Sequence, residues 1–314
     1  MSGILNFIKK KKFLNKDLQE FFRINFSFYK YFYVDDPFLL KKIITRYFDK
    51  LKIFGRIYIS SEGINVQGNI LKKYFYKMKC FIYKLHPKLN NLHINIGIDN
   101  TRQSFLSLKI KIKKKIVDDG LKENILQKKY NKKYLNAYEV NKFLKKKDVI
   151  FLDVRNYYEY RIGHFKNAIS TYTFTFRDHL KKIFNYISMY KNRKIVLYCT
   201  GGIRCEKTAF LIQKKGYKKV YQIYGGIIGY INECKKKKLP MKFLGNNFVF
   251  DLRLNEFISR KKISYCGQCF NKSDYYINCM NPKCNLLFIQ CFLCSRKYKS
   301  FCSKLCLKKF QKKK

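Results

Sequence analysis

Cys199 opens a short loop whose residue types favour a reactive thiolate. The loop comprises Cys199, Thr200, Gly201, Gly202, Ile203, Arg204 and Cys205. Two glycines let the backbone curl so that several N–H groups point inward, and such a concavity at a helix N-terminus stabilises an anion. Arg204 adds a positive charge that we expect to face the same place. A cysteine at the head of this loop should have a lowered pKa and act as a nucleophile near neutral pH.

The sequence leaves alternatives open for both cysteines of the loop. Cys199 could instead be a buried small apolar residue, but the flanking glycines and Arg204 argue against this. Cys205 is either a second redox thiol that attacks an intermediate on Cys199, or the first residue of the next helix, packing inward. A phosphatase loop of the Cys-loop-Arg kind is a further alternative. The segment from Cys199 to Arg204 is one residue tighter than that loop, which suits a sulfur species better.

Short apolar runs and helical patterns alternate around the loop. The predicted elements are strands at 149–154, 194–198 and 220–223 and helices at 137–145 and 205–215. Gly216 is a suitable C-terminal stop for the second helix, and Gly225-Gly226 follows the last strand. This alternation predicts a parallel α/β sheet. Because Tyr198 ends a strand, the Cys199 loop should lie at the carboxyl edge of the sheet, where such sheets place ligands.

Charged residues follow the strand at 149–154. Asp153 and Arg155 should lie beside the loop, with Glu159 shortly after them. We predict that these three residues brace the loop by charge-assisted hydrogen bonds. A structural ion-pair network is favoured over direct catalysis, and His164 is predicted to be structural too.

Eight of the twelve cysteines cluster near the C-terminal end. They are Cys266, Cys269, Cys279, Cys284, Cys291, Cys294, Cys302 and Cys306. Four close pairs suffice for two structural zinc sites with four thiolates each, and the two Cys-x2-Cys pairs carry the strongest signal. The pairs could combine sequentially, or interleave with the first pair meeting the third. Redox disulfides and an iron–sulfur cluster are less favoured alternatives. The module could bind unpaired bases of a nucleic acid through Lys297-Tyr298-Lys299, or serve only to stabilise the fold.

Composition sets the broad class of the protein. The chain has 314 residues, enough for two or three domains. It has no apolar run of 18 residues, so we expect no membrane span. The order of residues at the N-terminus does not suit a secretory signal, so we expect a cytoplasmic protein. The formal net charge of +49 is spread along the chain. Such a charge strengthens binding to any polyanion in a salt-dependent manner.

The segment 24–118 predicts a small α+β domain of ferredoxin-like type. The predicted elements are strands at 25–34, 55–60, 93–98 and 106–117, a turn at 61–65, and helices at 37–50 and 70–84. Residues 118–135 are polar and Lys-rich and predict a linker. A second linker is expected from about residue 240, before the cysteine cluster.

The central motifs are similar to those of a known family. Leu152-Asp-Val-Arg155, Glu159 and Gly163-His-Phe-Lys-Asn-Ala-Ile169 resemble the rhodanese pattern. The loop from Tyr198 to Lys207 resembles, more specifically, that of the bacterial rhodanese-domain tRNA uridine hydroxylases. Five further segments resemble sequences of the same family: Ser61-Glu-Gly-Ile-Asn65, Lys115-Ile-Val117, Gly120, Phe248-Val-Phe-Asp251 and the segment from Asn278 to Cys291. The family usually continues the first of these with Gly-Thr, where this chain has Val66-Gln67. Glu62 and Asn65 could contact tRNA, but a plain turn with Asx capping is favoured.

This resemblance spans residues 24–310 and implies both a fold and a function. It implies a ferredoxin-like (acylphosphatase-like) domain at 24–118, a rhodanese α/β domain with a parallel sheet at 136–235, and a Cys-rich zinc-type module at 245–310. The implied reaction is oxygen-dependent hydroxylation of the wobble uridine of certain tRNAs to 5-hydroxyuridine. tRNA is the implied partner and molecular oxygen the co-substrate. The sequence indicates no electron donor, no membrane partner and no obligate protein partner.

The residues themselves leave the reaction open. The four histidines lack the spacing of a two-His-one-carboxylate iron site, and no Gly-x-Gly-x-x-Gly loop occurs. The thiol of Cys199 is therefore the one evident reactive group. A sulfurtransferase that carries sulfane sulfur as a persulfide on Cys199 is the main alternative. A non-catalytic zinc and RNA-binding adaptor is disfavoured by the intact Cys199 and Arg204.

Overall fold

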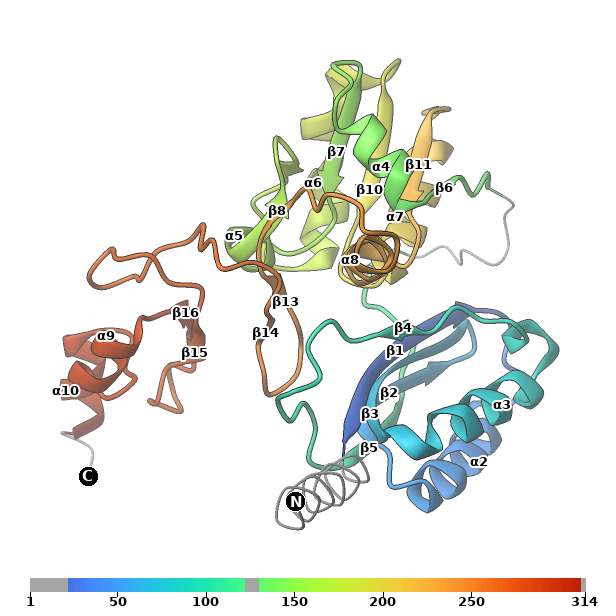
Figure 1. Cartoon of the computed structure of the whole chain (residues 1–314), viewed down its shortest axis with the longest axis horizontal. Helices are drawn as coiled ribbons and strands as arrows, with labels where there is room; N and C mark the ends of the chain where they lie inside the picture. Colours follow the sequence, from blue (N-terminus) through green and yellow to red (C-terminus); the bar gives the residue numbers. More distant parts are fainter. Residues whose placement is uncertain (1–21, 122–129, 312–314) are drawn as a thin grey trace, which may run out of the picture. The chain divides into compact units, whose positions relative to one another are not determined.

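The computed structural model describes residues 22–121 and 130–311. Contacts within the chain divide it into two compact units, with the boundary between residues 129 and 130. Each unit is described here by itself (Figure 1). The predicted fold class is confirmed: a unit with the ferredoxin-like order of elements is followed by a parallel α/β sheet and a Cys-rich end. Among the described residues, no helix combines the length and apolar character needed to span a membrane.

The first unit is a sheet covered on one face by two helices (Figure 1). Its elements are β1 (Arg23–Tyr31), α2 (Pro37–Lys50), β2 (Phe54–Ser60), β3 (Gly63–Leu71), α3 (Phe75–Leu85), β4 (Asn95–Ile96) and β5 (Leu108–Ile112). The strand order is β4-β1-β3-β2-β5, with β5 parallel to β2 and the other pairs antiparallel. The first six elements therefore follow the β-α-β-β-α-β order of a ferredoxin-like fold.

Local chemistry explains where α2 begins and what it covers. The Asp36 side chain accepts hydrogen bonds from the backbone N–H groups of Phe38 and Leu39, and Pro37 stands at the first helical position. The core lies between the helices and the sheet. Its fully buried members include Ile44 and Phe48 of α2, Met78 and Ile82 of α3, and Ile57, Ile59 and Ile64 of the sheet.

The turn predicted at 61–65 and the helix predicted from residue 70 are both wrong in part. Gly63–Leu71 forms strand β3, which pairs with both β1 and β2, and α3 begins only at Phe75. The polar residues of β3 obscure its strand pattern in the sequence. The strand is stabilised by its central position between β1 and β2. Gly63 is required at the start of β3 because its φ is +139° and a Cβ atom would lie 2.0 Å from the Lys30 carbonyl oxygen.

Glu62 and Asn65 tie the sheet to the segment that follows β5. A carboxylate oxygen of Glu62 accepts a hydrogen bond from the Ile116 N–H at 3.0 Å. The Asn65 amide donates to the Ile116 carbonyl oxygen at 3.2 Å. Two motifs that resemble the hydroxylase family therefore contact each other. These contacts favour a structural role for Glu62 and Asn65 over direct contact with tRNA.

The second unit begins with the parallel sheet. Its elements are β6 (Tyr134–Leu135), α4 (Ala137–Phe143), β7 (Val149–Asp153), α5 (Tyr157–Ile162), β8 (Gly163–Phe165), β9 (Ile169–Ser170), α6 (Phe176–Ile187), β10 (Lys194–Tyr198), α7 (Ile203–Lys214), β11 (Val220–Ile223) and α8 (Gly226–Lys237). The strand order is β6-β11-β10-β7-β9, and all neighbouring strands are parallel. The predicted linker at 118–135 thus ends in a strand, β6, and its residues 122–129 lie outside the described ranges.

The C-terminal part of the second unit packs on α5. Its elements are β12 (Phe243–Gly245), β13 (Asn247–Phe248), β14 (Asn255–Glu256), β15 (Tyr276–Asn278), β16 (Leu287–Ile289), α9 (Phe292–Lys297) and α10 (Lys304–Gln311). The linker expected from residue 240 is wrong in part, because β12 pairs with β8. Ile162 of α5 forms one buried cluster with Phe248, Tyr276 and Ile289.

Candidate active site

The Cys199 loop lies between β10 and α7, at the carboxyl edge of the parallel sheet. β10 occupies a central position between β11 and β7. The helix begins at Ile203 rather than at Cys205 as predicted. Gly202 accounts for the earlier start because, with φ of +103°, it turns the chain directly into the helix. Arg204 and Cys205 therefore belong to the first turn of α7.

The Cys199 thiol is buried and acidified. Its residue is 1% exposed, and Sγ accepts a hydrogen bond from the Gly202 N–H at 3.1 Å. Burial raises the pKa of Cys199, but a hydrogen bond from the Cys205 thiol and the charge of Arg204 outweigh it and lower the pKa to about 6. Burial, together with the neighbouring Cys199, raises the pKa of Cys205 well above its usual value. Cys205 thus stays protonated and donates to the Cys199 thiolate.

Arg204 is held by Glu159 of α5. The guanidinium donates to the two carboxylate oxygens of Glu159 at 2.6 and 2.8 Å, and both side chains are buried. The Thr200 hydroxyl also donates to Glu159, at 3.4 Å. The predicted charge beside the thiol is present, but it forms a bidentate pair rather than standing free in the loop. Glu159 is therefore the residue that ties the loop to α5.

Asp153 and Arg155 form a fully buried pair at the end of β7. The Arg155 guanidinium donates to the two Asp153 carboxylate oxygens at 2.9 and 2.6 Å. It also donates to the Gly163 carbonyl oxygen at 2.5 Å. These contacts fix the start of β8 and favour the structural ion-pair interpretation of Asp153 and Arg155. His164 lies in β8, with Nδ1 2.9 Å from the Tyr160 carbonyl oxygen.

The N-terminus of α8 holds the carbonyl groups of the loop. The Ile227 N–H donates to the Cys199 carbonyl oxygen at 2.9 Å, and the Ile228 N–H donates to that of Thr200 at 3.2 Å. Gly226 lies directly beneath the loop with φ of +64°, and a Cβ atom there would lie 2.5 Å from the Cys199 carbonyl oxygen. The sequence analysis located this glycine pair but not its contact with the loop.

A turn between β13 and β14, which the sequence analysis did not place at the site, also reaches the loop. The ring centroid of Phe250 lies 5.8 Å from the Arg204 guanidinium carbon. Arg253 fixes the turn through Asp251, with Nε–Oδ1 and guanidinium–Oδ2 distances of 2.9 and 2.6 Å. A sequence signal for this turn did exist, since Asp251-Leu252-Arg253 repeats the Asp-x-Arg spacing of Asp153 and Arg155.

Glu206, next to Cys205, was also missed as a structural centre. Its carboxylate accepts hydrogen bonds from the hydroxyl groups of Tyr130 and Tyr134. The ammonium group of Lys132 lies 2.8 Å from a carboxylate oxygen of Glu206. The start of the second unit is therefore fastened to the first turn of α7.

The eight C-terminal cysteines form two groups, and their pairing is interleaved. One group consists of Cys266, Cys269, Cys291 and Cys294, and the other of Cys279, Cys284, Cys302 and Cys306. Within each group all sulfur atoms lie within 4.8 Å of one another, and the Cys269–Cys291 and Cys284–Cys302 separations are 3.5 and 3.8 Å. A disulfide needs about 2.05 Å, whereas tetrahedral zinc with sulfur at about 2.3 Å requires sulfur separations of about 3.8 Å. Each group can therefore hold a metal ion.

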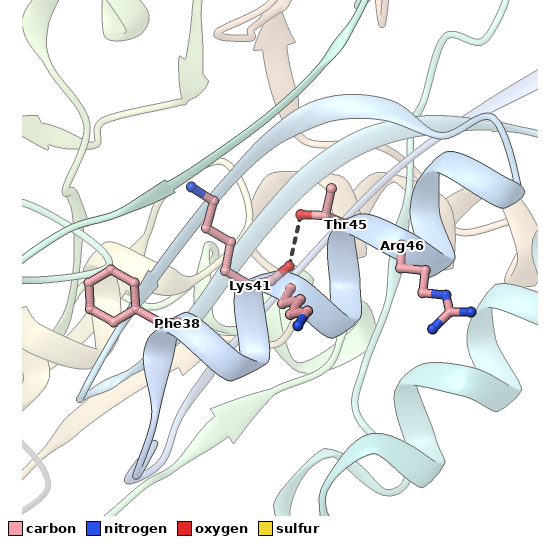
Figure 2. A pocket seen from close by; sticks show the side chains of 5 residues that line it. Phe38, Lys41, Thr45 and Arg46 are labelled. Atoms are coloured by element: carbon pink, nitrogen blue, oxygen red, sulfur yellow. Dashed lines mark hydrogen bonds between the residues drawn. The ribbon is translucent and has the colours of Figure 1, made fainter.

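A depression on the first unit lies on α2. It is lined by Phe38, Lys41, Lys42, Thr45 and Arg46 (Figure 2). The Thr45 hydroxyl donates to the Lys41 carbonyl oxygen at 2.8 Å. All five residues lie on one helix, and their side chains offer cationic groups but no nucleophile with a base beside it.

Comparison with known proteins identifies the family. Residues 23–116 match the family described as UPF0176 acylphosphatase like domain, residues 136–233 the Rhodanese-like domain, and residues 244–307 the Rhodanase C-terminal family. A tRNA uridine(34) hydroxylase of Buchnera aphidicola subsp. Acyrthosiphon pisum (strain APS) is 46% identical over 99% of this chain and 96% of its own length. One of Enterobacter sp. (strain 638) is 42% identical over 90% of this chain and 81% of its own length. The resemblance seen in the motifs is thus confirmed, and the chain belongs to the tRNA uridine(34) hydroxylase family.

Proposed function

We propose that this protein hydroxylates the wobble uridine of certain tRNAs to 5-hydroxyuridine with molecular oxygen as co-substrate. The observation that carries the proposal is the Cys199 thiol, acidified to a pKa of about 6 in a glycine loop, in a chain whose relatives are named for this reaction. In the overall reaction one oxygen atom is inserted into the C5–H bond of the uracil ring and gives a hydroxyl group. The other oxygen atom leaves as water, which requires two electrons and two protons from a reductant.

Each group of the site has a proposed part in this reaction. Cys199 is the reactive thiolate, and the Gly202 N–H and the Cys205 thiol stabilise its negative charge. Thr200, Gly201 and Ile203 shape the loop, and Arg204 holds a positive charge beside the sulfur. Glu159 orients Arg204. The pair of Asp153 and Arg155 holds the end of β7 to the start of β8 at Gly163.

The proposal also covers the wider organisation of the protein. We assign residues 24–118, 136–235 and 245–310 to three domains, of which the last holds two structural zinc ions. Four thiolates each are a typical zinc donor set, and zinc would supply folding energy to this short, Lys-rich segment. The substrate is tRNA, and the proposed compartment is the cytoplasm.

The test is nucleoside analysis of tRNA from a bacterial strain that lacks its own wobble-uridine hydroxylase. The strain is complemented with this chain, with Cys199→Ala or with Cys234→Ala, a buried cysteine on α8 that serves as the matched control. We expect 5-hydroxyuridine with the wild-type chain and with Cys234→Ala, and a loss of at least tenfold with Cys199→Ala. Thermal unfolding of the purified variants shows whether each one folds.

Two outcomes would contradict parts of the proposal. If 5-hydroxyuridine persists with Cys199→Ala, the assignment of the reactive residue is wrong although the reaction stands. If the wild-type chain restores no 5-hydroxyuridine but changes the content of thiolated uridine, the protein is a sulfurtransferase. The acidified thiol would then carry sulfane sulfur as a persulfide.

A further inference from the structure

The segment after β9 shows an inverted pattern of burial. Thr171 and Thr173 are buried, whereas Tyr172 and Phe174 are 60% and 66% exposed. A chain that alternates between core and solvent normally turns its apolar residues inward. Here the hydroxyl groups point inward and the aromatic rings point to solvent. The arrangement leaves apolar area in water and therefore needs a reason.

Hydrogen bonds hold this inversion in place. The Thr171 hydroxyl lies 3.0 Å from the Thr173 hydroxyl and 2.7 Å from Nδ1 of His179, which is fully buried on α6. Tyr172 adopts a left-handed conformation with φ of +52°, which is unfavourable for a bulky residue. The exposed position of the rings is thus maintained at a cost by the surrounding structure.

The two rings join a third to form one surface. The centroid of the Tyr157 ring lies 4.9 Å from that of Tyr172 and 6.3 Å from that of Phe174. A backbone hydrogen bond joins the same two segments, since the Tyr157 N–H donates to the Thr173 carbonyl oxygen at 2.7 Å. We call Tyr157, Tyr172 and Phe174 the aromatic platform.

The aromatic platform lies at the same edge of the sheet as the Cys199 loop. Asp153, the last residue of β7, is in register with the last residues of β10 and β9, Tyr198 and Ser170. The chain leaves β10 into the Cys199 loop and leaves β9 into the platform. Tyr157 also begins α5, whose Glu159 holds Arg204. One short helix therefore connects the platform with the loop.

We propose that the aromatic platform stacks on the unpaired bases that flank the target uridine in the anticodon loop of the tRNA. This inference rests on the proposed function and names the surface by which that site recognises its substrate. Aromatic faces stack on any base, and proteins bind unpaired RNA loops in this way. The net charge of +49 favours a polyanion over a protein of ordinary surface charge. The platform supplies stacking, and the positive net charge of the chain supplies long-range attraction.

The experiment measures the binding of anticodon stem-loop RNA by the full-length protein. The variants are Tyr172→Ala, Phe174→Ala and Phe174→Leu, and the control is Tyr138→Ala, an exposed tyrosine on α4. We expect Kd to rise about tenfold for each lost ring, since stacking on one base contributes at this level. Tyr138→Ala should leave Kd unchanged, and Phe174→Leu should behave like Phe174→Ala because leucine has no π face.

A second RNA makes the test specific for stacking. In this RNA, abasic nucleotides replace the two neighbours of the target uridine. Wild-type protein should bind it about as weakly as a Tyr172→Ala/Phe174→Ala double variant binds the intact RNA, and these substitutions should then weaken binding no further. Equal Kd values for wild type and platform variants on intact RNA would overturn the inference. Normal RNA binding combined with lost modification in cells would overturn it in favour of a protein partner at this surface.

These outcomes remain separable from failure of the proposed function. If the wild-type chain makes no 5-hydroxyuridine in cells, the reaction is wrong whatever the platform binds. If the wild type makes it and the platform variants make equal amounts at limiting expression, only the present inference fails. Should Tyr172→Ala unfold, Phe174→Leu decides the result, because it preserves apolar volume at an exposed position.

Discussion

At the scale of residues, the site depends on two thiols that lie together but differ in protonation. Cys199 is acidified, whereas the pKa of Cys205 is raised well above its usual value. Both are buried, so burial alone cannot separate them. The separation arises because the hydrogen bond between the two thiols lowers the pKa of Cys199 and raises that of Cys205, and the backbone N–H groups of Arg204 and Gly202 also donate to the Cys199 sulfur. The structure therefore assigns Cys205 the part of a positioning residue for Cys199.

Replacement of Cys205 should change the pH profile of Cys199 alkylation. In the wild type, thiolate accumulates as pH rises through about 6, so alkylation should be half-maximal there and level off by about pH 8. Cys205→Ala removes the donor and should move the midpoint upward. Cys205→Ser restores a donor and should move it back. Pulsed iodoacetamide labelling with mass spectrometry of the Cys199 peptide measures this, and identical midpoints for the alanine and serine variants would contradict the role of Cys205.

At the scale of elements, the loop is clamped between two helix N-termini. Gly202, the N-cap residue of α7, donates its N–H to the sulfur, and α8 supplies the N–H groups of Ile227 and Ile228 to the loop carbonyls. The backbone of the loop is thus largely determined before any substrate arrives. Such preorganisation is what stabilises an anion without reorganisation at the moment of reaction.

Gly226→Ala should disrupt this clamp, and Gly216→Ala is its matched control. Both glycines have positive φ, at +64° and +87°, but the added Cβ would lie 2.5 Å from the Cys199 carbonyl oxygen at Gly226 and 3.8 Å from a flexible lysine at Gly216. The backbone strain alone costs about 1–2 kcal/mol at either position. We expect Gly226→Ala to lower the free energy of unfolding by more than Gly216→Ala and to abolish modification. Denaturant unfolding and tRNA analysis check this; equal effects of both variants would show that the clamp is not needed.

At the scale of the whole molecule, the Cys-rich end packs on elements that carry the candidate active site. Tyr276 and Ile289 pack on Ile162 of α5, and the Tyr276 hydroxyl donates to the Tyr158 carbonyl oxygen at 2.9 Å. The turn that carries Phe250 contacts Arg204. The segment that carries the two cysteine groups therefore packs on the helix that supplies Glu159.

Metal analysis should find about two zinc ions per chain, since eight thiolates serve two tetrahedral sites. Cys266→Ser should remove about one ion and loosen the Cys-rich end, whereas Cys234→Ser, outside both groups, should keep both ions. A strong chelator should make the segment after β14 sensitive to trypsin, because metal binding supplies its folding energy. Atomic absorption and limited proteolysis check these results. A chain that contains no zinc yet resists trypsin would refute the structural role.

The sequence alone located the Cys199 loop, the order of most elements and the family. The Cys199 loop and strands β10 and β11 are encoded locally, by the placement of glycines and by apolar runs. The predicted bounds of both strands, Lys194–Tyr198 and Val220–Ile223, are therefore correct. The eight metal-type cysteines were also evident from spacing. Strand β3 was missed because its stability comes from two neighbouring strands rather than from its own polar residues.

Only the tertiary structure decided which distant groups meet. The pairing of Arg204 with Glu159, the contact of Gly226 with the loop and the interleaving of the cysteine pairs each join residues far apart in the chain. Spacing along a sequence does not encode such contacts, because they depend on how separate elements pack. For the same reason the exposed rings of Tyr172 and Phe174 became meaningful only when their buried threonine neighbours were seen.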